Sequence, residues 1–179
     1  GRVTRDKGIK ELIDAFRILK AHHENLKLLI VGPNEGDAHT LLAAYKKEEF
    51  VDITFEGYSR EPEKFMAIAN LFVLPSYREG FGTVIIEANA MGLASVGTDI
   101  PGLRDAIIDR STGLLVPAQN VEALVIAIRE LFENEVLRRQ LADKALVRVQ
   151  DFSSVKINLA MAEEYTWLLK KLFKAQLNS

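Results

Sequence analysis

The sequence predicts an α/β fold in which a parallel sheet carries helices on both faces. Short apolar runs, such as residues 71–74, are typical of buried parallel strands. They alternate with segments whose apolar residues recur at helical spacing, and no repeat or linker interrupts the alternation. A chain of 179 residues can bury one good core. We therefore expect residues 1–179 to form a single Rossmann-like, doubly wound domain of about six strands.

In the first half of the chain, turn residues separate the predicted elements. Helical spacing predicts a helix over 9–19, and the apolar run at 26–31 predicts a strand that Gly32 and Pro33 end. A polar loop leads to a helix at 37–49, and Gly57 closes a strand at 51–55. Pro62 suits the first turn of a short helix at 61–68. The apolar strand at 71–74 follows.

The second half continues the same pattern. Thr83 can cap a helix at 84–91, which precedes a short strand at 94–97. The remaining predicted elements are a helix at 103–108, a strand at 113–116 and helices at 121–132, 135–149 and 155–175. In such a sheet, ligands bind beyond the carboxyl ends of the strands, where strand order reverses. A binding site is therefore expected in the loops that follow the strands.

Composition excludes several classes of protein. The net charge of −2 lacks the basic excess of a nucleic-acid binder, so no nucleic-acid partner is expected. The absence of cysteine excludes disulfides, thiolate zinc sites and cysteine nucleophiles. No apolar run is long enough to span a membrane, and no signal peptide is recognised. These features predict a cytoplasmic protein.

The most informative segment is residues 75–87, which places Glu79 and Glu87 on either side of a predicted helix start. Gly80 and Gly82 allow a sharp turn and a close approach to a ligand. The free N–H groups at a helix start bind phosphate, and carboxylates accept hydrogen bonds from sugar hydroxyls. This combination is what a nucleotide sugar requires. The alternative interpretation is two unrelated surface carboxylates.

A second candidate feature is the N-terminal arm, residues 1–8, in which Arg2 and Lys7 precede a predicted helix. Cations are unfavourable at a helix start unless an anion lies nearby. Arg2 could bind two phosphate oxygens and Lys7 could add a point charge. The alternative is a solvated basic arm.

These segments together resemble the C-terminal, nucleotide-sugar-binding half of retaining glycosyltransferases of the GT-B fold, in particular family 4. Glu79 and Glu87 match the Glu-x7-Glu motif of that family. Further matching stretches occur in family order at 1–8, 28–32, 55–57, 72–76, 102–105 and 112–117. The resemblance implies a missing N-terminal domain that binds the acceptor.

The resemblance also implies roles for individual residues. Arg2 and Lys7 would neutralise the donor diphosphate, Glu79 would touch the transferred sugar, and Glu87 would bind the ribose hydroxyls. Backbone amides would hold sugar and phosphate oxygens, and two loops would contact the base. The amides are those of Gly80, Phe81, Gly82, Thr83 and Val84, and the base contacts would come from Tyr58, Ser59, Pro75 and Ser76.

The implied function is transfer of a sugar from a UDP- or GDP-sugar to a glycan or lipid-linked acceptor, in polysaccharide or lipopolysaccharide biosynthesis. A hexosyltransferase of this type generally works without a metal or other cofactor, and no Asp-x-Asp triplet is present. We expect the isolated domain to bind nucleotide but to turn over poorly. The alternatives are a nucleotide-sugar epimerase or hydrolase of similar fold and a non-catalytic α/β nucleotide-binding domain.

The C-terminal segment from Tyr165 to Lys174 mixes aromatic and aliphatic residues with lysines. Such a helix can dock against another domain, or it can contact the inner face of the membrane weakly as a peripheral surface helix. Both interpretations remain open at this point.

Overall fold

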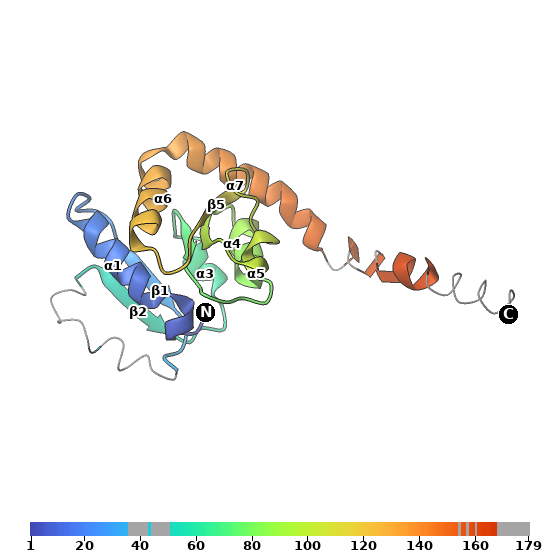
Figure 1. The fold of residues 1–179 in the computed structure, drawn as a ribbon, viewed down its shortest axis with the longest axis horizontal. Helices are drawn as coiled ribbons and strands as arrows, with labels where there is room; N and C mark the ends of the chain where they lie inside the picture. The colour runs from blue at the N-terminus through green and yellow to red at the C-terminus, as the bar shows by residue number, and fades with distance from the viewer. Residues whose placement is uncertain (36–42, 44–50, 154, 157, 160, 168–179) are drawn as a thin grey trace, which may run out of the picture.

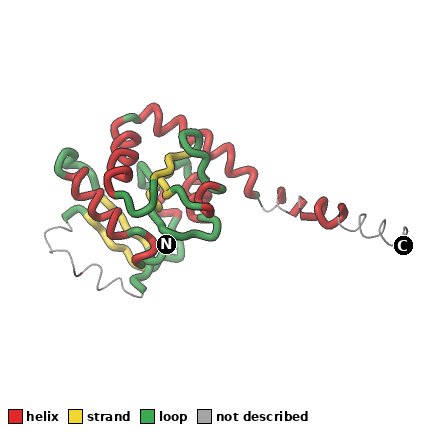
Figure 2. Tube along the Cα trace, in the orientation of Figure 1, coloured by secondary structure: helices red, strands yellow, loops and turns green. Residues whose placement is uncertain are grey.

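The structure is a computed structural model that describes residues 1–35, 43, 51–153, 155, 156, 158, 159 and 161–167. Strands and helices alternate along the chain, which confirms the α/β class (Figures 1 and 2). The helix predicted at 37–49 lies almost entirely outside the described residues, as do positions beyond 167 of the final predicted helix.

The strands form two parallel sheets rather than one. β1 (Leu28–Val31) pairs with β2 (Ile53–Gly57). β3 (Phe72–Leu74), β4 (Ser95–Thr98) and β5 (Gly113–Val116) form the second sheet in that order. The expectation of about six strands in one sheet is therefore wrong for the described part of the chain, which has five. β1 and β3 do not pair, and residues of both strands line one cavity.

The helices agree with the predicted positions, with differences at their ends. They are α1 (Ile9–Lys20), α3 (Glu63–Met66), α4 (Thr83–Ala90), α5 (Pro101–Arg104), α6 (Val121–Glu133) and α7 (Glu135–Val149), with 3-10 turns η1 (Arg5–Lys7) and η3 (Gln150–Phe152). α5 begins earlier than predicted because Pro101 is well suited to the first position of a helix. α3 is shorter than predicted and begins after Pro62.

Helices cover both faces of the β3–β4–β5 sheet. On one face, α1 and α6 pack together over Val96 and Leu114. On the other face, Leu74 of β3 packs with α4 and α5, and the larger core residues there are Ile85 and Leu103. Successive strand residues point to opposite faces, so both faces of a covered sheet must be apolar. This layering places the loops that follow the strands at one exposed edge.

The described residues between 155 and 167 are helical and extend away from the body of the domain (Figure 1). Tyr165 and Trp167 are exposed there. None of the described helices combines the length and the hydropathy needed to cross a membrane.

Candidate functional site

The N-terminal arm, residues 1–8, joins the carboxyl ends of β1 and β3. The Val3 N–H donates to the Pro33 carbonyl, 2.9 Å away, just after β1. The Tyr77 N–H donates to the Asp6 carbonyl, 2.8 Å away, just after β3. The arm and the loop at 75–82 therefore lie against each other, at the edge where a parallel sheet binds ligands.

Gly8 allows this close approach. It adopts a left-handed φ of 67°, and a Cβ added there would lie 2.1 Å from the Pro75 carbonyl oxygen. Both the backbone conformation and the space therefore require glycine. Gly8 is also the N-cap of α1, so the arm and the helix start are fixed by the same residue.

The central feature of the site is an ion pair between Lys7 and Glu79. The Lys7 Nζ lies 2.6 Å from the Glu79 Oε1, and the Ser76 Oγ donates to the same oxygen at 2.8 Å. The two charged side chains are only 16% and 14% exposed, so solvent screens them weakly. An ammonium has three donors, so Lys7 keeps hydrogen-bonding capacity for a further acceptor.

Buried contacts with the end of β4 and the start of α5 hold the loop that carries Glu79. Ser76 is fully buried, and its carbonyl accepts a hydrogen bond from the buried Thr98 Oγ1 at the end of β4. Gly102 packs directly under the loop, because a Cβ there would lie 2.2 Å from the Glu79 carbonyl oxygen. The position of Glu79 is thus set by β3, β4 and the start of α5 together.

The predicted helix start lies next to this cluster. α4 begins at Thr83, and its N-cap is Gly82 in a left-handed conformation. The prediction that Thr83 caps the helix is therefore wrong, because Gly82 occupies the N-cap position and Thr83 is the first residue of the helix. The first N–H groups of the helix, at Thr83 and Val84, remain available to an anion. Gly80 and the exposed Phe81 complete the turn.

Glu87 is exposed, one turn into α4, as predicted. Burial lowers the pKa of the Gly1 amine and Lys7 lowers it further, whereas Glu79 and Glu87 raise that pKa. Both carboxylates and Lys7 are thus close enough to Gly1 to act on its charge.

Arg2 is placed differently from Lys7. Its Nη1 pairs with the Glu35 Oε2 at 3.4 Å, and both side chains are about half exposed. Arg2 lies beside the segment that follows β1, where the neighbouring Val3 forms a parallel bridge with Asn34. Its long side chain would have to leave Glu35 to reach a diphosphate beside Lys7.

The predicted base-contacting residues fall into two groups. Pro75 and Ser76 are buried beneath the arm and the Glu79 loop. Tyr58 and Ser59 follow β2, where Tyr58 is 71% exposed and the Ser59 Oγ accepts a hydrogen bond from the Glu61 N–H at 3.1 Å. The exposed ring of Tyr58 is free to stack on a flat ligand, whereas Ser76 shapes the loop.

A family model described as glycosyl transferases group 1 matches residues 1–148. The chain belongs to this family. It is 33% identical over 173 residues to a capsular polysaccharide biosynthesis glycosyltransferase, CapM, of Staphylococcus aureus, covering 96% of this chain and 46% of that protein. A second relative is the N-acetylgalactosamine-N,N'-diacetylbacillosaminyl-diphospho-undecaprenol 4-alpha-N-acetylgalactosaminyltransferase of Campylobacter jejuni. The two are 34% identical over 160 residues, which cover 88% of this chain and 42% of that protein.

The fold is also found among solved glycosyltransferase structures. Sucrose-phosphate synthase from Thermosynechococcus elongatus superposes with a TM-score of 0.81 at 31% identity, covering 96% of this chain and 44% of that one. The chain therefore corresponds to the C-terminal half of a GT-B glycosyltransferase, and it spans about half the length of the relatives it matches.

In this glycosyltransferase domain, sequence analysis missed the residues that hold the site in place. The Tyr77 hydroxyl donates to the Glu11 Oε2 of α1 at 2.7 Å, and burial together with this hydrogen bond raises the pKa of Tyr77. Thr98 and Gly102 were likewise not recognised as supports of the loop. The position of Tyr77 between Ser76 and Glu79 is a signal that could have drawn attention to it.

The aromatic side chain of Phe81 is linked to the C-terminal end of α7. Its ring packs edge-on against Phe152 at a centroid distance of 5.4 Å, and the Arg148 guanidinium lies 5.1 Å from the Phe152 ring centroid. Edge-to-face aromatic pairs of this kind are favourable beyond their buried area. Phe81 is therefore packed against η3, and Arg148 of α7 contacts the same Phe152 ring.

The described residues contain no group of three or more His, Asp or Glu side chains placed to hold a metal ion. The Lys7–Glu79 pair brings an ammonium and a carboxylate close to the helix-start amides of α4. This set can bind a polyanion through the cation and the amides, and it can bind hydroxyl groups through the carboxylate.

Proposed function

We propose that this chain is the donor-binding domain of a retaining glycosyltransferase that uses a nucleoside-diphosphate sugar. The observation that supports this proposal best is the partly buried Lys7–Glu79 pair beside the free N–H groups of α4. A cation and helix-start amides can together bind a diphosphate, and a carboxylate close by can bind sugar hydroxyls.

In this proposal, each side chain has a separate task. Lys7 neutralises charge that develops on the departing diphosphate, and Arg2 adds a second cation after it leaves Glu35. Glu79 binds a hydroxyl of the transferred sugar, and Glu87 binds the ribose hydroxyls. The base, from UDP or GDP, lies toward Tyr58 and Ser59. We expect donor binding without a metal ion, because the cations and amides supply the positive charge.

The acceptor is proposed from the relatives rather than from this chain's own site. One relative is named for capsular polysaccharide biosynthesis and another for transfer to a diphospho-undecaprenol-linked sugar. We therefore propose a glycan or lipid-linked acceptor, held by parts of the protein outside these residues. Retention would follow if the leaving phosphate assists the incoming hydroxyl on the same face of the sugar, with the protein supplying position and charge.

Calorimetric titration tests donor binding directly. UDP, GDP, ADP and NAD are titrated into the chain, into Glu87→Ala and into Glu122→Ala. The last variant removes an exposed glutamate of another helix, α6, as a matched control. We expect one nucleoside diphosphate to bind preferentially, and Glu87→Ala alone to weaken it by about tenfold, equal to about 1.4 kcal/mol. Equal affinities in all three proteins would contradict the role of Glu87.

Retention is tested on the full-length protein. After reaction with the preferred donor sugar, the anomeric configuration of the product is read from its NMR coupling constants. The proposal predicts the same configuration in product and donor. An inverted product would reject the retaining mechanism while leaving the donor site intact.

A further inference from the structure

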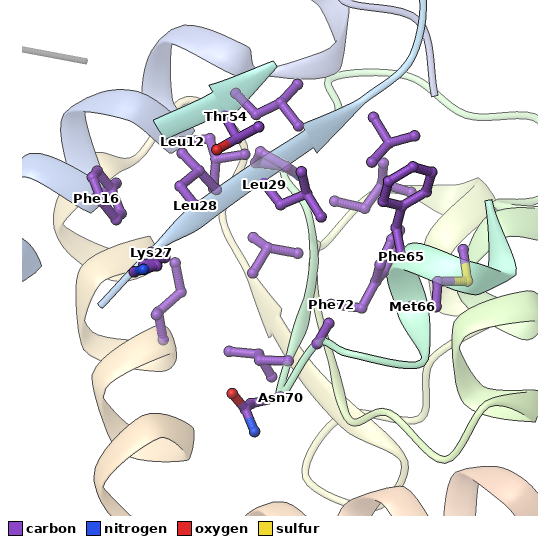
Figure 3. Close-up of a pocket in the computed structure, with 18 of the residues that line it drawn as sticks. Leu12, Phe16, Lys27, Leu28, Leu29, Thr54, Phe65, Met66, Asn70 and Phe72 are labelled. Carbon is purple, nitrogen blue, oxygen red and sulfur yellow. The ribbon is translucent and has the colours of Figure 1, made fainter. Parts of the chain in front are cut away.

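Two cavities of the domain differ in chemical character. The larger, of about 630 Å³, is lined mostly by apolar side chains, among them Leu12, Phe16 and Met66 (Figure 3). A more open one, of about 500 Å³, lies where the N-terminal arm meets the loops that follow β3 and β5. Its lining residues are Arg5, Asp6, Tyr77, Arg78 and Gln119. We call this second cavity the arginine pocket.

A backbone hydrogen bond brings the two arginines of this pocket together. The Tyr77 N–H donates to the Asp6 carbonyl at 2.8 Å. Arg78 follows the first of these residues and Arg5 precedes the second, and both line the pocket. Arg5 begins the 3-10 turn η1 and Lys7 ends it. Successive residues of a 3-10 helix lie about 120° apart around its axis, so these two cations of the arm point in different directions.

The two guanidinium groups of the pocket have no partner within the protein. In the part of the chain that the structure describes, neither Arg5 nor Arg78 forms an ion pair or a side-chain hydrogen bond, and both are exposed. Other exposed arginines each hold a carboxylate, in the pairs Arg2–Glu35, Arg104–Asp99 and Arg110–Glu130. Two unpaired cations at one pocket repel each other, and a bound anion removes that repulsion.

The remaining polar groups beside the arginines are already engaged. The Asp6 Oδ1 accepts a hydrogen bond from the Thr4 Oγ1 at 2.5 Å, and the Tyr77 hydroxyl donates to Glu11. The hydrogen bond from Thr4, with the Arg78 charge nearby, holds the pKa of Asp6 below its ordinary value, so this carboxyl is ionised at neutral pH. Two guanidinium groups thus face one carboxylate, and the pocket keeps an excess of positive charge.

Gln119 has a backbone conformation that is unusual for its residue type. Its φ of 59° lies in the left-handed region that favours glycine. The start of α6 does not need its side chain, because Asn120 is the N-cap and accepts a hydrogen bond from the Ala123 N–H. Gln119 is exposed and borders the arginine pocket. Unusual backbone conformations of this kind cluster at ligand sites, and here the conformation carries an amide to the pocket.

We propose that the arginine pocket binds a phosphate group of a ligand other than the sugar donor. The binding groups come from three segments, with Arg5 on the arm, Arg78 after β3 and Gln119 after β5. A phosphate presents oxygens to several sides, and a guanidinium binds two of them through paired N–H donors. A carboxylate has only two oxygens for the three groups. The volume of the pocket leaves room for the part of the ligand that carries the phosphate.

The pocket adjoins the candidate site without including its cation. Arg78 is the neighbour of Glu79 in the chain, and Arg5 belongs to the same turn as Lys7, yet Lys7 does not line the pocket. A phosphate held there lies beside the diphosphate assigned to Lys7. Under the proposed function, the ligand that lies beside the donor is the acceptor, so this phosphate belongs to the acceptor. That last step rests on the proposed function, whereas phosphate binding by the pocket does not.

Titration with inorganic pyrophosphate, followed through the NMR signals of backbone amides, tests phosphate binding. In the parent chain, the signals of Arg78 and Gln119 should shift together and saturate. Arg5→Gln and Arg78→Gln should each weaken this binding by about tenfold. Arg139→Gln removes an exposed arginine of α7 and is the matched control, which should leave the affinity unchanged. Unchanged affinity in the Arg5 and Arg78 variants, with folding confirmed by circular dichroism, would overturn the proposal.

Gln119→Gly separates binding from stability. Glycine adopts the left-handed conformation without strain, so the variant should keep or raise the Tm of the parent. It should nevertheless weaken pyrophosphate binding by about threefold, because the amide is lost. Unchanged affinity would remove Gln119 from the site.

A second titration distinguishes this phosphate from that of the donor. With the preferred nucleoside diphosphate at saturation, pyrophosphate should still shift Arg78 and Gln119, with a Kd within about twofold of the first value. Loss of these shifts would show that the pocket is part of the donor site and would overturn the proposal. If the nucleotide itself leaves the signals of Thr83 and Val84 unchanged while pyrophosphate shifts Gln119, the pocket stands and the proposed function fails.

Kinetics of the full-length protein identify the source of the phosphate. At saturating donor, pyrophosphate should inhibit transfer, and a higher acceptor concentration should relieve the inhibition because both occupy the pocket. Arg78→Gln should weaken this inhibition by about tenfold. Inhibition that does not depend on the acceptor concentration would show that the pocket takes a free phosphate compound and would overturn its assignment to the acceptor.

Discussion

In the β3–β4–β5 sheet, every residue of β4 is buried, whereas β1 and β2 have partly buried and exposed positions along their length. The loops differ in the same way. The loop after β3 is tied to the N-terminal arm, to Thr98 and to α1, while the loop after β2 leaves Tyr58 largely exposed. The side of the site that would meet the diphosphate and sugar is thus rigidly supported, and the side assigned to the base is open.

This difference suggests that one side of the site stabilises charge and the other recognises the base. Groups that stabilise charge act best when they are preorganised and do not have to move during the reaction. Recognition of a base by an exposed aromatic ring needs much less support. If the two sheets and their loops differ in this way, substitutions in them should also differ in their effect on the free energy of unfolding.

The largest difference is expected in core stability. Leu114 of β5 is 3% exposed, whereas Leu29 of β1 is partly buried beside the cavity that β1 and β3 line. We expect Leu114→Ala to lower the free energy of unfolding of the chain by about 2–5 kcal/mol, because it leaves a cavity in a packed core. Leu29→Ala should lower the free energy of unfolding by less than about 2 kcal/mol. Urea denaturation measures both, and equal losses would break the comparison.

A smaller effect is expected at the buried support of the Glu79 loop. Thr98→Val removes the hydroxyl that donates to the Ser76 carbonyl and leaves that carbonyl buried without this donor. The expected loss in the free energy of unfolding is about 1–3 kcal/mol. Thr54→Val, at an exposed position of β2, is the matched control and should stay within about 0.5 kcal/mol of the parent. Similar values for the two variants would show that the hydroxyl of Thr98 does not support the loop.

The smallest effect is expected at the link between Tyr77 and Glu11. Tyr77→Phe should lower the free energy of unfolding by about 1 kcal/mol at neutral pH, because it removes one hydrogen bond to a carboxylate. Burial, followed by that hydrogen bond, raises the pKa of Tyr77. The folded protein therefore holds this proton more tightly than the unfolded chain does.

The sign of the pH dependence follows from this direction. The stabilisation by Tyr77 is fully present below the ordinary tyrosine pKa of about 10 and is lost as the pH rises through the higher folded-state pKa. The stability difference between the parent and Tyr77→Phe should thus be constant from pH 7 to about pH 9 and shrink above about pH 10. A difference that grows above pH 10 would contradict this account.

Local sequence patterns predicted the elements and the position of the motif well. The apolar runs located all five described strands to within two residues, because a buried parallel strand leaves a continuous apolar signature. The Glu79 loop and the start of α4 were found from glycine spacing. The identity of the cap was wrong, because Gly82 takes a left-handed conformation and leaves Thr83 inside the helix.

The features that the sequence did not predict depend on contacts between residues that are far apart in the chain. Tyr77 and Glu11 are 66 positions apart, and Thr98 and Ser76 are 22 apart. No periodicity connects such pairs, because they meet only after strands and helices have packed. The separation into two sheets was missed for the same reason: strand patterns identify strands but not which edges pair. Arg2 was grouped with Lys7 by proximity in sequence, whereas in the structure it pairs with Glu35.

The central claim is that the supported side of the site binds the donor diphosphate through Lys7. The most direct test is titration of the preferred nucleoside diphosphate into the chain, Lys7→Gln and Lys144→Gln, the last being an exposed lysine of α7 that serves as a control. Our account predicts that Lys7→Gln weakens binding by about tenfold or more, and that Lys144→Gln leaves it unchanged. Circular dichroism would confirm that each variant is folded. Unchanged affinity in a folded Lys7→Gln protein would contradict the claim.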